Sequence, residues 1–400
     1  FDIVITEIGG TVGDIESLPY VEAVRQMLWE HENDCIVVHL TLVPYLSAAG
    51  ELKTKPTQHS VKQLLELGVQ PDVLCCRTEH ELDLGLRKKI AKFCNVSVNA
   101  VIEARDAESI YDVPLLMQTE ELDTVVLEKL GLSKKQAPKL DNWKAFLDTL
   151  KNPKHTVKIG LVGKYVELKD AYKSISEAFI HAGVANQTKV ELSWIHSETV
   201  DEDNVASTLT GLDGILVAPG FGSRGIDGKI AAVKFARENN IPFLGICLGM
   251  QIAVIEFARH VLGLSDAHST EMSEQTKAPV ISMMEEQKII SNMGGTMRLG
   301  AYKCELKPNS NAAKAYQTIN ITERHRHRYE FNNEFLTQYE AQGMIATGKN
   351  PETGLVEVVE IPNHPWFVGV QFHPEYKSTV DAPHPLFVGF VKAALNHQTN

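Results

Sequence analysis

Short apolar runs bounded by glycine or proline alternate with amphipathic helical patterns along the whole chain. A run of apolar residues without polar alternation is typical of a parallel strand, which is buried on both of its faces. Regular alternation of such strands with helices predicts an α/β fold, here two doubly wound domains with mostly parallel sheets. The predicted strands cover residues 1–8, 35–43, 73–76, 100–103, 157–162, 214–218, 242–246 and 367–371, and helical spacing is clearest at 20–30 and 60–67.

The stretch at 131–155 separates two series of strands and helices. It is polar, contains two prolines and has only one short helical pattern, as is typical of a linker. At 400 residues the chain is also longer than one typical core requires. We therefore predict a domain at 1–130, a linker at 131–155 and a second domain at 156–400. Because a domain seldom begins inside its own sheet, the predicted strand at Phe1 also leads us to expect further chain ahead of it.

Composition argues against several classes of protein. The net charge of -12 argues against a broad nucleic-acid surface, which needs an excess of lysine and arginine. No apolar run approaches the ~18–20 residues that a membrane span needs. The six cysteines include no CxxC spacing, and therefore a disulfide framework or a zinc knuckle is not expected. We expect a cytoplasmic protein that binds neither nucleic acid nor membranes.

The strongest chemical signal is the segment 242–251, in which Cys247 stands between Gly245 and Gly249 where a predicted strand meets a predicted helix. Small residues on both sides allow the strained turn of a nucleophile elbow. A cysteine at a helix N-terminus is favoured as the thiolate, and the free N–H groups there stabilise a developing oxyanion. The alternative is a buried structural cysteine at a strand end, and the elbow alone leaves that alternative open.

A histidine and a carboxylate follow another predicted strand. His373 and Glu375 lie just beyond the strand at 367–371, and ligands bind outside the carboxyl ends of strands in open α/β sheets. We predict that His373 deprotonates Cys247 and later protonates the leaving group, while Glu375 holds the imidazole tautomer. A histidine near a strand end is more often structural, but its combination with the elbow favours a catalytic triad.

The elbow Gly-Ile-Cys-Leu-Gly-Met-Gln and the downstream Phe-His-Pro-Glu resemble those of class I glutamine amidotransferases, over about residues 157–390. The resemblance implies that Cys247 hydrolyses glutamine and releases ammonia. It places the oxyanion loop at 218–225, where Pro219 removes one N–H donor and leaves Gly220 as the donor. Without the resemblance, this loop is simply a glycine-rich turn after a strand. By the same resemblance, glutamine is held by Gly220, Leu248, Gly249, Met250, Gln251, Glu271 and Arg328.

Five further stretches, at 6–18, 50–61, 292–300, 323–330 and 362–367, resemble the CTP synthase family and stand in that family's order. The implied reaction is the ATP-dependent amination of UTP to CTP with nitrogen from glutamine, the last step of de novo CTP synthesis. The implied fold is a truncated P-loop-type amidoligase domain followed by the amidotransferase domain. The resemblance also implies a homotetramer, filament assembly, GTP as allosteric activator and CTP as feedback inhibitor.

The resemblance assigns nucleotide-binding residues in the first domain. Glu7 follows a predicted strand and would hold the Mg²⁺ that accompanies ATP, although a solvated glutamate is the simpler interpretation of that position alone. Lys53 and Lys55, in a segment predicted to be extended, place both ammonium groups on one side for a triphosphate; a charged surface loop is the alternative. UTP and CTP are assigned to Asp14, Ile15, Glu16, Lys53, Thr54, Lys55, Pro56, Thr57, Gln58 and Lys89, and ATP to Arg105, Asp106 and Ala107.

Arginine and histidine alternate at 324–328. A strand there would place the arginines on one face and His325 and His327 on the other. A His-x-His metal site is open in principle but is not favoured, because no pattern of carboxylate or cysteine ligands accompanies it. By resemblance, residues 294–300, with Arg298, form a lid implicated in activation by GTP.

The chain departs from the family in one respect. A CTP synthase normally begins with a glycine- and serine-rich phosphate loop ending in Gly-Lys-Gly, and the segment at 160–164 is no substitute, because it lies in a predicted strand and has different spacing. The chain from Phe1 is therefore expected to retain only the glutaminase half-reaction. Two alternatives remain: a stand-alone glutaminase or γ-glutamyl hydrolase with a non-catalytic N-terminal domain, and a non-enzymatic scaffold, which the presence of Cys247, His373 and Glu375 disfavours.

Overall fold

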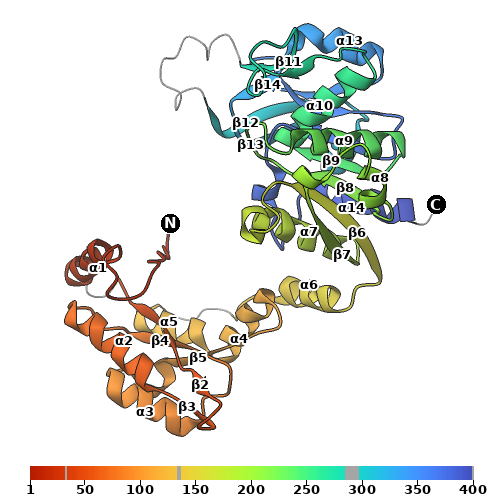
Figure 1. Ribbon diagram of the computed structural model, residues 1–400. Coiled ribbons are helices and arrows are strands. Elements are labelled where there is room, and N and C mark those ends of the chain that lie inside the picture. The colour runs from red at the N-terminus through yellow and green to blue at the C-terminus, as the bar shows by residue number, and fades with distance from the viewer. Residues whose placement is uncertain (32–33, 133–136, 284–296, 399–400) are drawn as a thin grey trace. The chain divides into compact units, whose positions relative to one another are not determined.

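The chain folds into two compact units, Phe1–Lys139 and Leu140–Asn400, drawn in red to orange and in yellow to blue in Figure 1. The structure, a computed structural model, describes residues 1–31, 34–132, 137–283 and 297–398. The division falls inside the polar stretch at 131–155. Helix α6 (Asp141–Lys151), which comes from that stretch, packs against α7 (Lys173–Ala185) of the second unit.

Unit 1 is built on a three-stranded parallel sheet in the order β1-β4-β5. Its core lies between this sheet and the helices α2 and α3, where Val43, Val61, Leu74 and Ile90 pack together. The strands are β1 (Val38–Leu42), β4 (Val73–Thr78) and β5 (Val101–Arg105), with a short hairpin of β2 (Tyr45–Leu46) and β3 (Glu51–Leu52), and the helices are α1 (Leu18–Glu30), α2 (Lys55–Glu66), α3 (Leu84–Cys94), α4 (Val113–Thr119) and α5 (Leu122–Lys129).

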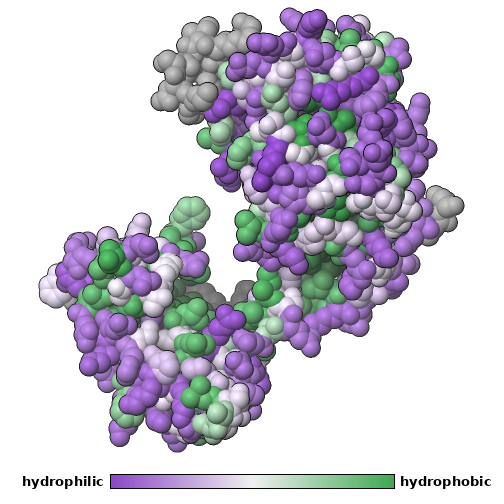
Figure 2. All heavy atoms as spheres, in the orientation of Figure 1, coloured by the Kyte–Doolittle hydropathy of each residue, from purple (hydrophilic) through white to green (hydrophobic). Residues whose placement is uncertain are grey.

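The predicted strand at 1–8 is wrong, because these residues form no regular element and all of them are exposed. A strand needs a neighbour to satisfy its backbone N–H and C=O groups, and no described strand pairs with this segment. The apolar side chains of Ile3, Val4 and Ile5 are therefore exposed, as is the outward face of β1. Figure 2 shows hydrophobic side chains on the surface of this unit.

Unit 2 is built on a nine-stranded sheet in the order β13-β12-β15-β16-β17-β9-β8-β6-β7. The five strands from β17 to β7 are parallel, and the others pair antiparallel. The four strands predicted here are all present, and the doubly wound α/β prediction is confirmed. The strands are β6 (His155–Gly163), β7 (Thr188–His196), β8 (Gly214–Val217), β9 (Phe243–Ile246), β12 (Arg298–Leu306), β13 (Asn320–His327), β15 (Ile345–Lys349), β16 (Val356–Glu360) and β17 (Phe367–Val370).

Helices cover both faces of this sheet (Figure 1). Ile215 and Val217 of β8 pack with helices α9 and α10 in one core, while Leu216 between them packs with α7 and α14 in the other. This burial on both faces explains why the central strands are continuous apolar runs. The helices are α8 (Val205–Leu209), α9 (Ile226–Glu238), α10 (Leu248–His260), α12 (Asn311–Tyr316), α13 (Leu336–Ala341) and α14 (Pro385–Gln398), and a small second sheet contains β10 (Ala267–Ser269), β11 (Ala278–Met283) and β14 (Tyr329–Phe331).

Within the described residues, the search for membrane-spanning segments finds no helix that combines sufficient length with sufficient apolar character.

Candidate active site

Cys247 occupies a strained turn between β9 and α10. Its backbone has φ 52° and ψ -103°, a conformation that side chains with a Cβ rarely adopt and that is common at functional sites. A Cβ on Gly245 would lie 2.7 Å from the backbone of Gly249, and a Cβ on Gly249 would lie 2.1 Å from the carbonyl oxygen of Val217. The glycines on either side are therefore required by close backbone approach, as the elbow pattern predicts.

The strand that carries the histidine lies directly beside the strand that carries the cysteine. Strands β9 and β17 pair in parallel with Ile246 opposite Val370, and the Cys247 amide donates a hydrogen bond to the Val370 carbonyl oxygen at 2.7 Å. His373 follows three residues after Val370, and its amide donates to the Arg324 carbonyl oxygen at 2.8 Å. The nucleophile and the base therefore meet at the carboxyl edge of adjacent strands.

His373 and Glu375 form a buried ion pair. The distance from His373 Nδ1 to Glu375 Oε1 is 2.8 Å, and both side chains are almost fully buried. Burial lowers the pKa of His373, but hydrogen bonding and charge from Cys247 and Glu375 outweigh that effect and raise the pKa to about 11. The other ring nitrogen, Nε2, makes no well-aligned hydrogen bond to a described residue, as is common in active sites without substrate. The arrangement favours a protonated imidazole beside Cys247 at neutral pH.

A glutamine that the sequence reasoning did not assign also contacts the nucleophile. Gln371 Nε2 donates to the Cys247 sulfur at 3.6 Å. Its own oxygen accepts from Gln251 Nε2 at 3.2 Å, and Gln251 Nε2 also donates to the Tyr329 carbonyl oxygen at 2.9 Å. The amide of Gln251 therefore orients Gln371. The only signal in the sequence was the position of Gln371 two residues before His373, on the same strand face.

The predicted oxyanion donors lie on two segments. Leu248 is the first residue of α10, where the helix dipole and the free N–H groups favour negative charge. Gly220 lies in the loop after β8, and its amide makes no hydrogen bond to any group in the described part of the chain. Two residues further on, the Gly222 amide donates to Glu271 Oε1 at 2.9 Å, which connects this loop to a residue predicted to hold glutamine.

The other residues predicted to hold glutamine lie around Tyr329. Burial is the main cause that raises the pKa of the Tyr329 phenol. The charge of Glu271 raises this pKa further and the charge of Arg328 lowers it, which places both charges close to the ring. Met250 is fully buried in the core of unit 2, and a Cβ on Gly369 would lie 3.2 Å from it. Its side chain, like that of Gln251, therefore points into the protein, and contacts from 248–251 to a substrate would come from the backbone.

A buried ionic cluster lies close to His373, whose charge acts on the ring of His325. As predicted, β13 exposes Arg324 and Arg326 and buries His325 and His327. His325 Nδ1 lies 2.8 Å from His327 Nε2. Arg298 donates to Glu330 at 3.0 Å and to Glu357 at 2.9 Å, and burial is the main cause that raises the pKa of Glu330 to about 7.

The sequence argued against a metal site on His325 and His327 for lack of a carboxylate, but the fold supplies Glu357. One ligand atom from each of these three residues lies within 4.8 Å of the others. The Arg298 guanidinium already compensates both carboxylates of the cluster, however, and a divalent cation there would face it at close range. Burial and the charge of Arg298 lower the pKa of His325 to about 3, and the imidazole is therefore neutral.

The predicted lid at 294–300 falls partly on residues 294–296, which lie outside the described residues, as does 292–293 of the longer motif. Arg298 itself is buried at the start of β12 and is held by the two carboxylates.

The lysine segment of unit 1 is not extended throughout, which corrects the prediction: Lys53 lies between β3 and α2, whereas Lys55 is helical. Helix α2 begins at Lys55, and Pro56 stands in its first turn, where the missing N–H costs no helical hydrogen bond. Lys53 forms a close ion pair with Glu51, and Lys89 also lowers the pKa of that carboxyl, which places three charged groups together. Thr57 is buried and donates to the Leu42 carbonyl oxygen at 3.0 Å, Gln58 donates to the Thr54 hydroxyl at 3.1 Å, and Thr54 precedes the helix.

The remaining predicted nucleotide residues lie at the surface of unit 1. Arg105 lies 3.2 Å from Glu103, and Asp106 lies 3.2 Å from Arg77. Asp14 accepts from the Thr11 amide at 3.0 Å, and Ile15 and Glu16 are exposed, while Ala107 is half-buried. Glu7 is exposed in a segment without regular structure and belongs to no group of metal-ligating side chains among the described residues. A single exposed carboxylate supplies too few oxygen ligands to hold Mg²⁺ by itself.

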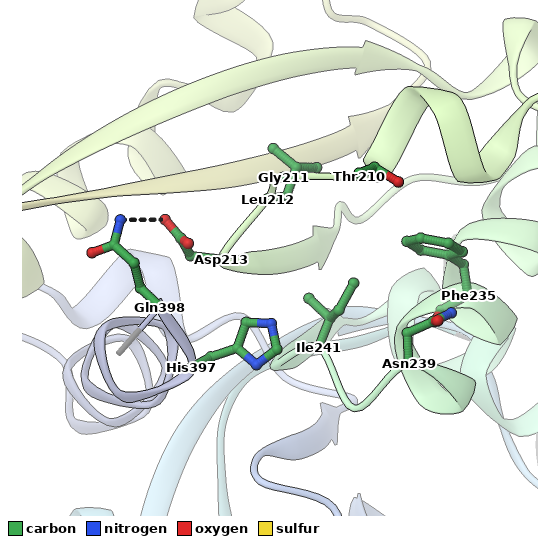
Figure 3. Close-up of a pocket in the computed structure, with 9 residues that line it drawn as sticks. All are labelled: Thr210, Gly211, Leu212, Asp213, Phe235, Asn239, Ile241, His397 and Gln398. Carbon is green, nitrogen blue, oxygen red and sulfur yellow. Dashed lines mark hydrogen bonds between the residues drawn. The ribbon is translucent and has the colours of Figure 1, made fainter. Parts of the chain in front are cut away.

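Two cavities of unit 2 lie away from the triad residues. Figure 3 shows one of about 340 Å³, in which Asp213 accepts from Gln398 at 3.4 Å and His397 and Ile241 line the wall. Asp213 and Ile241 precede β8 and β9, whereas Cys247 follows β9. Because these strands are parallel, the cavity lies at the opposite edge of the sheet from the triad.

Comparisons with known proteins agree with this site. Residues 167–393 match the family model of class-I glutamine amidotransferases, and residues 1–132 match that of the CTP synthase N-terminus. The solved glutaminase domain of Trypanosoma brucei CTPS with bound acivicin is 39% identical, with a TM-score of 0.57, and the match covers 60% of this chain and 94% of that one. The fold and the site therefore define unit 2 as a class I glutamine amidotransferase.

Two curated relatives match nearly the whole chain. The CTP synthase of Flavobacterium johnsoniae is 64% identical over 397 residues, which are 99% of this chain and 74% of that protein. The CTP synthase of Cytophaga hutchinsonii is 67% identical over 395 residues, which are 98% of this chain and 73% of that protein. The chain belongs to the CTP synthase family.

Proposed function

We propose that the chain is a glutamine-hydrolysing ligase that aminates UTP to CTP at the expense of ATP, with ammonia released at Cys247. The observation that carries the proposal is the elbow cysteine on β9 beside the His373–Glu375 pair that follows β17. Family membership supports the acceptor half of the reaction, in which UTP is aminated. The geometry of unit 2 supports the donor half, in which glutamine releases ammonia.

The proposed donor half-reaction begins from the state in which His373 already holds the proton of Cys247, and the sulfur attacks the side-chain amide carbon of glutamine. The amides of Gly220 and Leu248 stabilise the oxyanion of the tetrahedral intermediate. When that intermediate collapses, the C–N bond breaks, His373 donates its proton to the leaving nitrogen, and ammonia departs. Water, deprotonated by His373, then hydrolyses the γ-glutamyl thioester to glutamate and restores the thiol.

Glu375 keeps the imidazole in the tautomer that presents Nε2 to the sulfur, because it accepts the Nδ1–H. Gln371 holds the sulfur from a second direction. We propose that Glu271 receives the α-amino group of glutamine and Arg328 its α-carboxylate, which complementary charge favours.

In the proposed acceptor half-reaction, ATP transfers its γ-phosphoryl group to O4 of UTP and leaves as ADP, and ammonia then displaces phosphate at C4. We propose that UTP and the inhibitor CTP contact Asp14–Glu16, Lys53–Gln58 and Lys89, and that ATP contacts Arg105–Ala107. Lys53 and Lys89 both lower the pKa of the Glu51 carboxyl, and their positive charges therefore lie close together. This pair of charges supports the proposal that a triphosphate binds beside them. GTP activation, Mg²⁺ bound with ATP, a homotetramer that forms filaments and a cytoplasmic location are further proposals that rest on the family.

The proposal is tested by incubating the chain with the electrophile 6-diazo-5-oxo-norleucine and mapping the modified residue by mass spectrometry. Labelling at Cys247 that glutamine prevents is expected, together with loss of glutamine hydrolysis. Labelling elsewhere would overturn the site. CTP formation from UTP, ATP and glutamine is measured in parallel in a protein that carries the family's phosphate-loop segment ahead of Phe1; glutamine hydrolysis without CTP formation in that protein favours a stand-alone glutaminase or γ-glutamyl hydrolase instead.

A further inference from the structure

A lysine that the proposed mechanism does not use lies directly beneath the oxyanion loop. Lys229, in the first turn of α9, is fully buried, with 0% of its surface exposed. Its Nζ donates to the Ala218 carbonyl oxygen at 3.0 Å. The same Nζ lies 3.8 Å from the position that a Cβ on Gly220 would occupy. The amine is therefore in contact with the residue whose amide is proposed to stabilise the oxyanion.

A second buried lysine holds the other end of the loop. Lys164, which follows β6, donates from Nζ to the Phe221 carbonyl oxygen, and its Cε also lies 3.8 Å from the Cβ position of Gly220. The Gly222 amide is held by Glu271. The carbonyl groups on both sides of Gly220 thus accept hydrogen bonds from lysines on two different elements, and these bonds fix the orientation of the peptide groups around the Gly220 N–H.

Burying an amine without a carboxylate is costly, and the cost indicates a function. In the described part of the chain, Lys229 has no ion pair. Burial and the positive charge of Lys164 lower its pKa to about 7, while Cys247 acts in the opposite direction. A methionine would fill the same space without a desolvation penalty. Stability of the core alone therefore does not explain a lysine at this position.

We propose that Lys229, together with Lys164, is a positioning residue of the glutamine-hydrolysing site: it holds the Ala218 carbonyl and thereby aims the Gly220 amide at the oxygen that becomes anionic when Cys247 attacks. Because Pro219 has no N–H, Gly220 supplies the first amide of this loop that faces the site. An amide aimed at the tetrahedral oxygen contributes to the transition state and much less to the bound ground state. The inference rests on the proposed glutaminase function of the same site.

The test compares Lys229→Met with the wild-type chain in steady-state glutamine hydrolysis. Loss of an oxyanion donor lowers kcat by ~10²–10³-fold, and a displaced donor is expected to lower kcat by at least ~10-fold with KM within about threefold. Below about pH 7, where the Lys229 amine is protonated, its charge attracts the negative charge of a Cys247 thiolate. The pH profile of Cys247 alkylation by iodoacetamide should therefore fall below the wild-type profile at pH values under 7 in the variant, which a purely structural role does not predict.

Lys234→Met is the matched control, because Lys234 lies on the same helix and only pairs with Glu202 at 3.5 Å; wild-type kinetics are expected. Wild-type kcat and an unchanged alkylation profile in folded Lys229→Met overturn the inference. If that variant does not fold, Lys164→Met decides by the same split between kcat and KM, and a wild-type kcat there overturns it. If the wild-type chain does not hydrolyse glutamine, the proposed function and the inference both fail. If the wild type is active and Lys229→Met and Lys164→Met have the same kcat as wild type, only the inference fails.

Discussion

Gly249 lies so close to Val217 that a Cβ at Gly249 would be 2.1 Å from the Val217 carbonyl oxygen. This approach brings the first turn of α10 against β8 and so places the Leu248 amide beside the oxyanion loop that follows β8. The nucleophile elbow therefore depends on the absence of a side chain two residues after the nucleophile.

Gly249→Ala should disrupt the elbow. The added methyl group forces α10 away from β8, and we expect a loss of about 1–3 kcal/mol in the free energy of unfolding. The rates of Cys247 labelling and glutamine hydrolysis should fall by more than the decrease in folded protein explains. Urea denaturation and labelling kinetics measure the two effects. Gly220→Ala is the stability control, because its Cβ would meet only ordinary contacts at 3.4 Å or more. Unchanged stability and labelling in Gly249→Ala would show that the elbow tolerates a side chain.

Removing the thiol should lower the pKa of His373. Cys247 and Glu375 together raise that pKa to about 11 against the effect of burial. We expect Cys247→Ala to lower it by at least about one unit, because one of the two side chains that raise it is lost. NMR titration of the ring, assigned with His373→Asn, measures the shift. Cys304→Ala is the control, since Cys304 is an equally buried thiol of unit 2. An unchanged His373 titration in Cys247→Ala would contradict the contact between sulfur and imidazole.

The lowered pKa of Lys229 predicts a pH-dependent stability. Between about pH 7 and the ordinary lysine value of 10.5, the unfolded chain binds a proton that the folded chain does not. Stability contributed by this group therefore rises with pH across that window, by at most ~1.4 kcal/mol per pH unit. The difference in unfolding free energy between wild type and Lys229→Met should grow in favour of wild type from pH 7 to pH 9. A difference that stays constant would mean that the buried amine is charged throughout.

Arg298 should be essential to the cluster close to His373. Arg298→Met leaves Glu330 and Glu357 buried without a cation, and we expect a loss of about 3–5 kcal/mol. The triple variant Arg298→Met, Glu330→Gln, Glu357→Gln should recover much of that loss, because no uncompensated charge remains. Urea denaturation measures the free energy of unfolding of each variant. Lys303→Met, on the same strand but in an exposed pair with Glu352, should cost about 0–1 kcal/mol. A mild effect of Arg298→Met would indicate that one carboxylate is already protonated.

The sequence predicted the arrangement of residues at the strand ends well, because that arrangement depends on local patterns. The glycines around Cys247 and the spacing of His373 and Glu375 are fixed by turn geometry and strand periodicity. Gln371 and Gln251 are separated by 120 residues, and their contact depends on which strands become neighbours. Lys229 has the same limitation, since a lysine in a helix is normally solvated and nothing local indicates its burial.

The errors in unit 1 have a related cause. The apolar pattern of 1–8 indicates a preference for burial, but a strand also needs a neighbouring strand, and pattern alone does not supply one. An extended segment is predicted around Lys53 and Lys55, whereas α2 begins at Lys55 and Pro56 is compatible with its first turn. The carboxylate that joins His325 and His327, Glu357, lies on another strand, beyond the reach of local ligand spacing.

The Cys247 amide donates a main-chain hydrogen bond to Val370, and only Gln371 and Phe372 separate Val370 from His373. The distance between nucleophile and base is therefore set by the pairing of two adjacent strands, and not by a hinge or a long loop. Heating or denaturant should consequently leave ammonia release intact until the central strands themselves separate, and the enzyme should have no inactive but still folded form in which its two reactive groups have drifted apart.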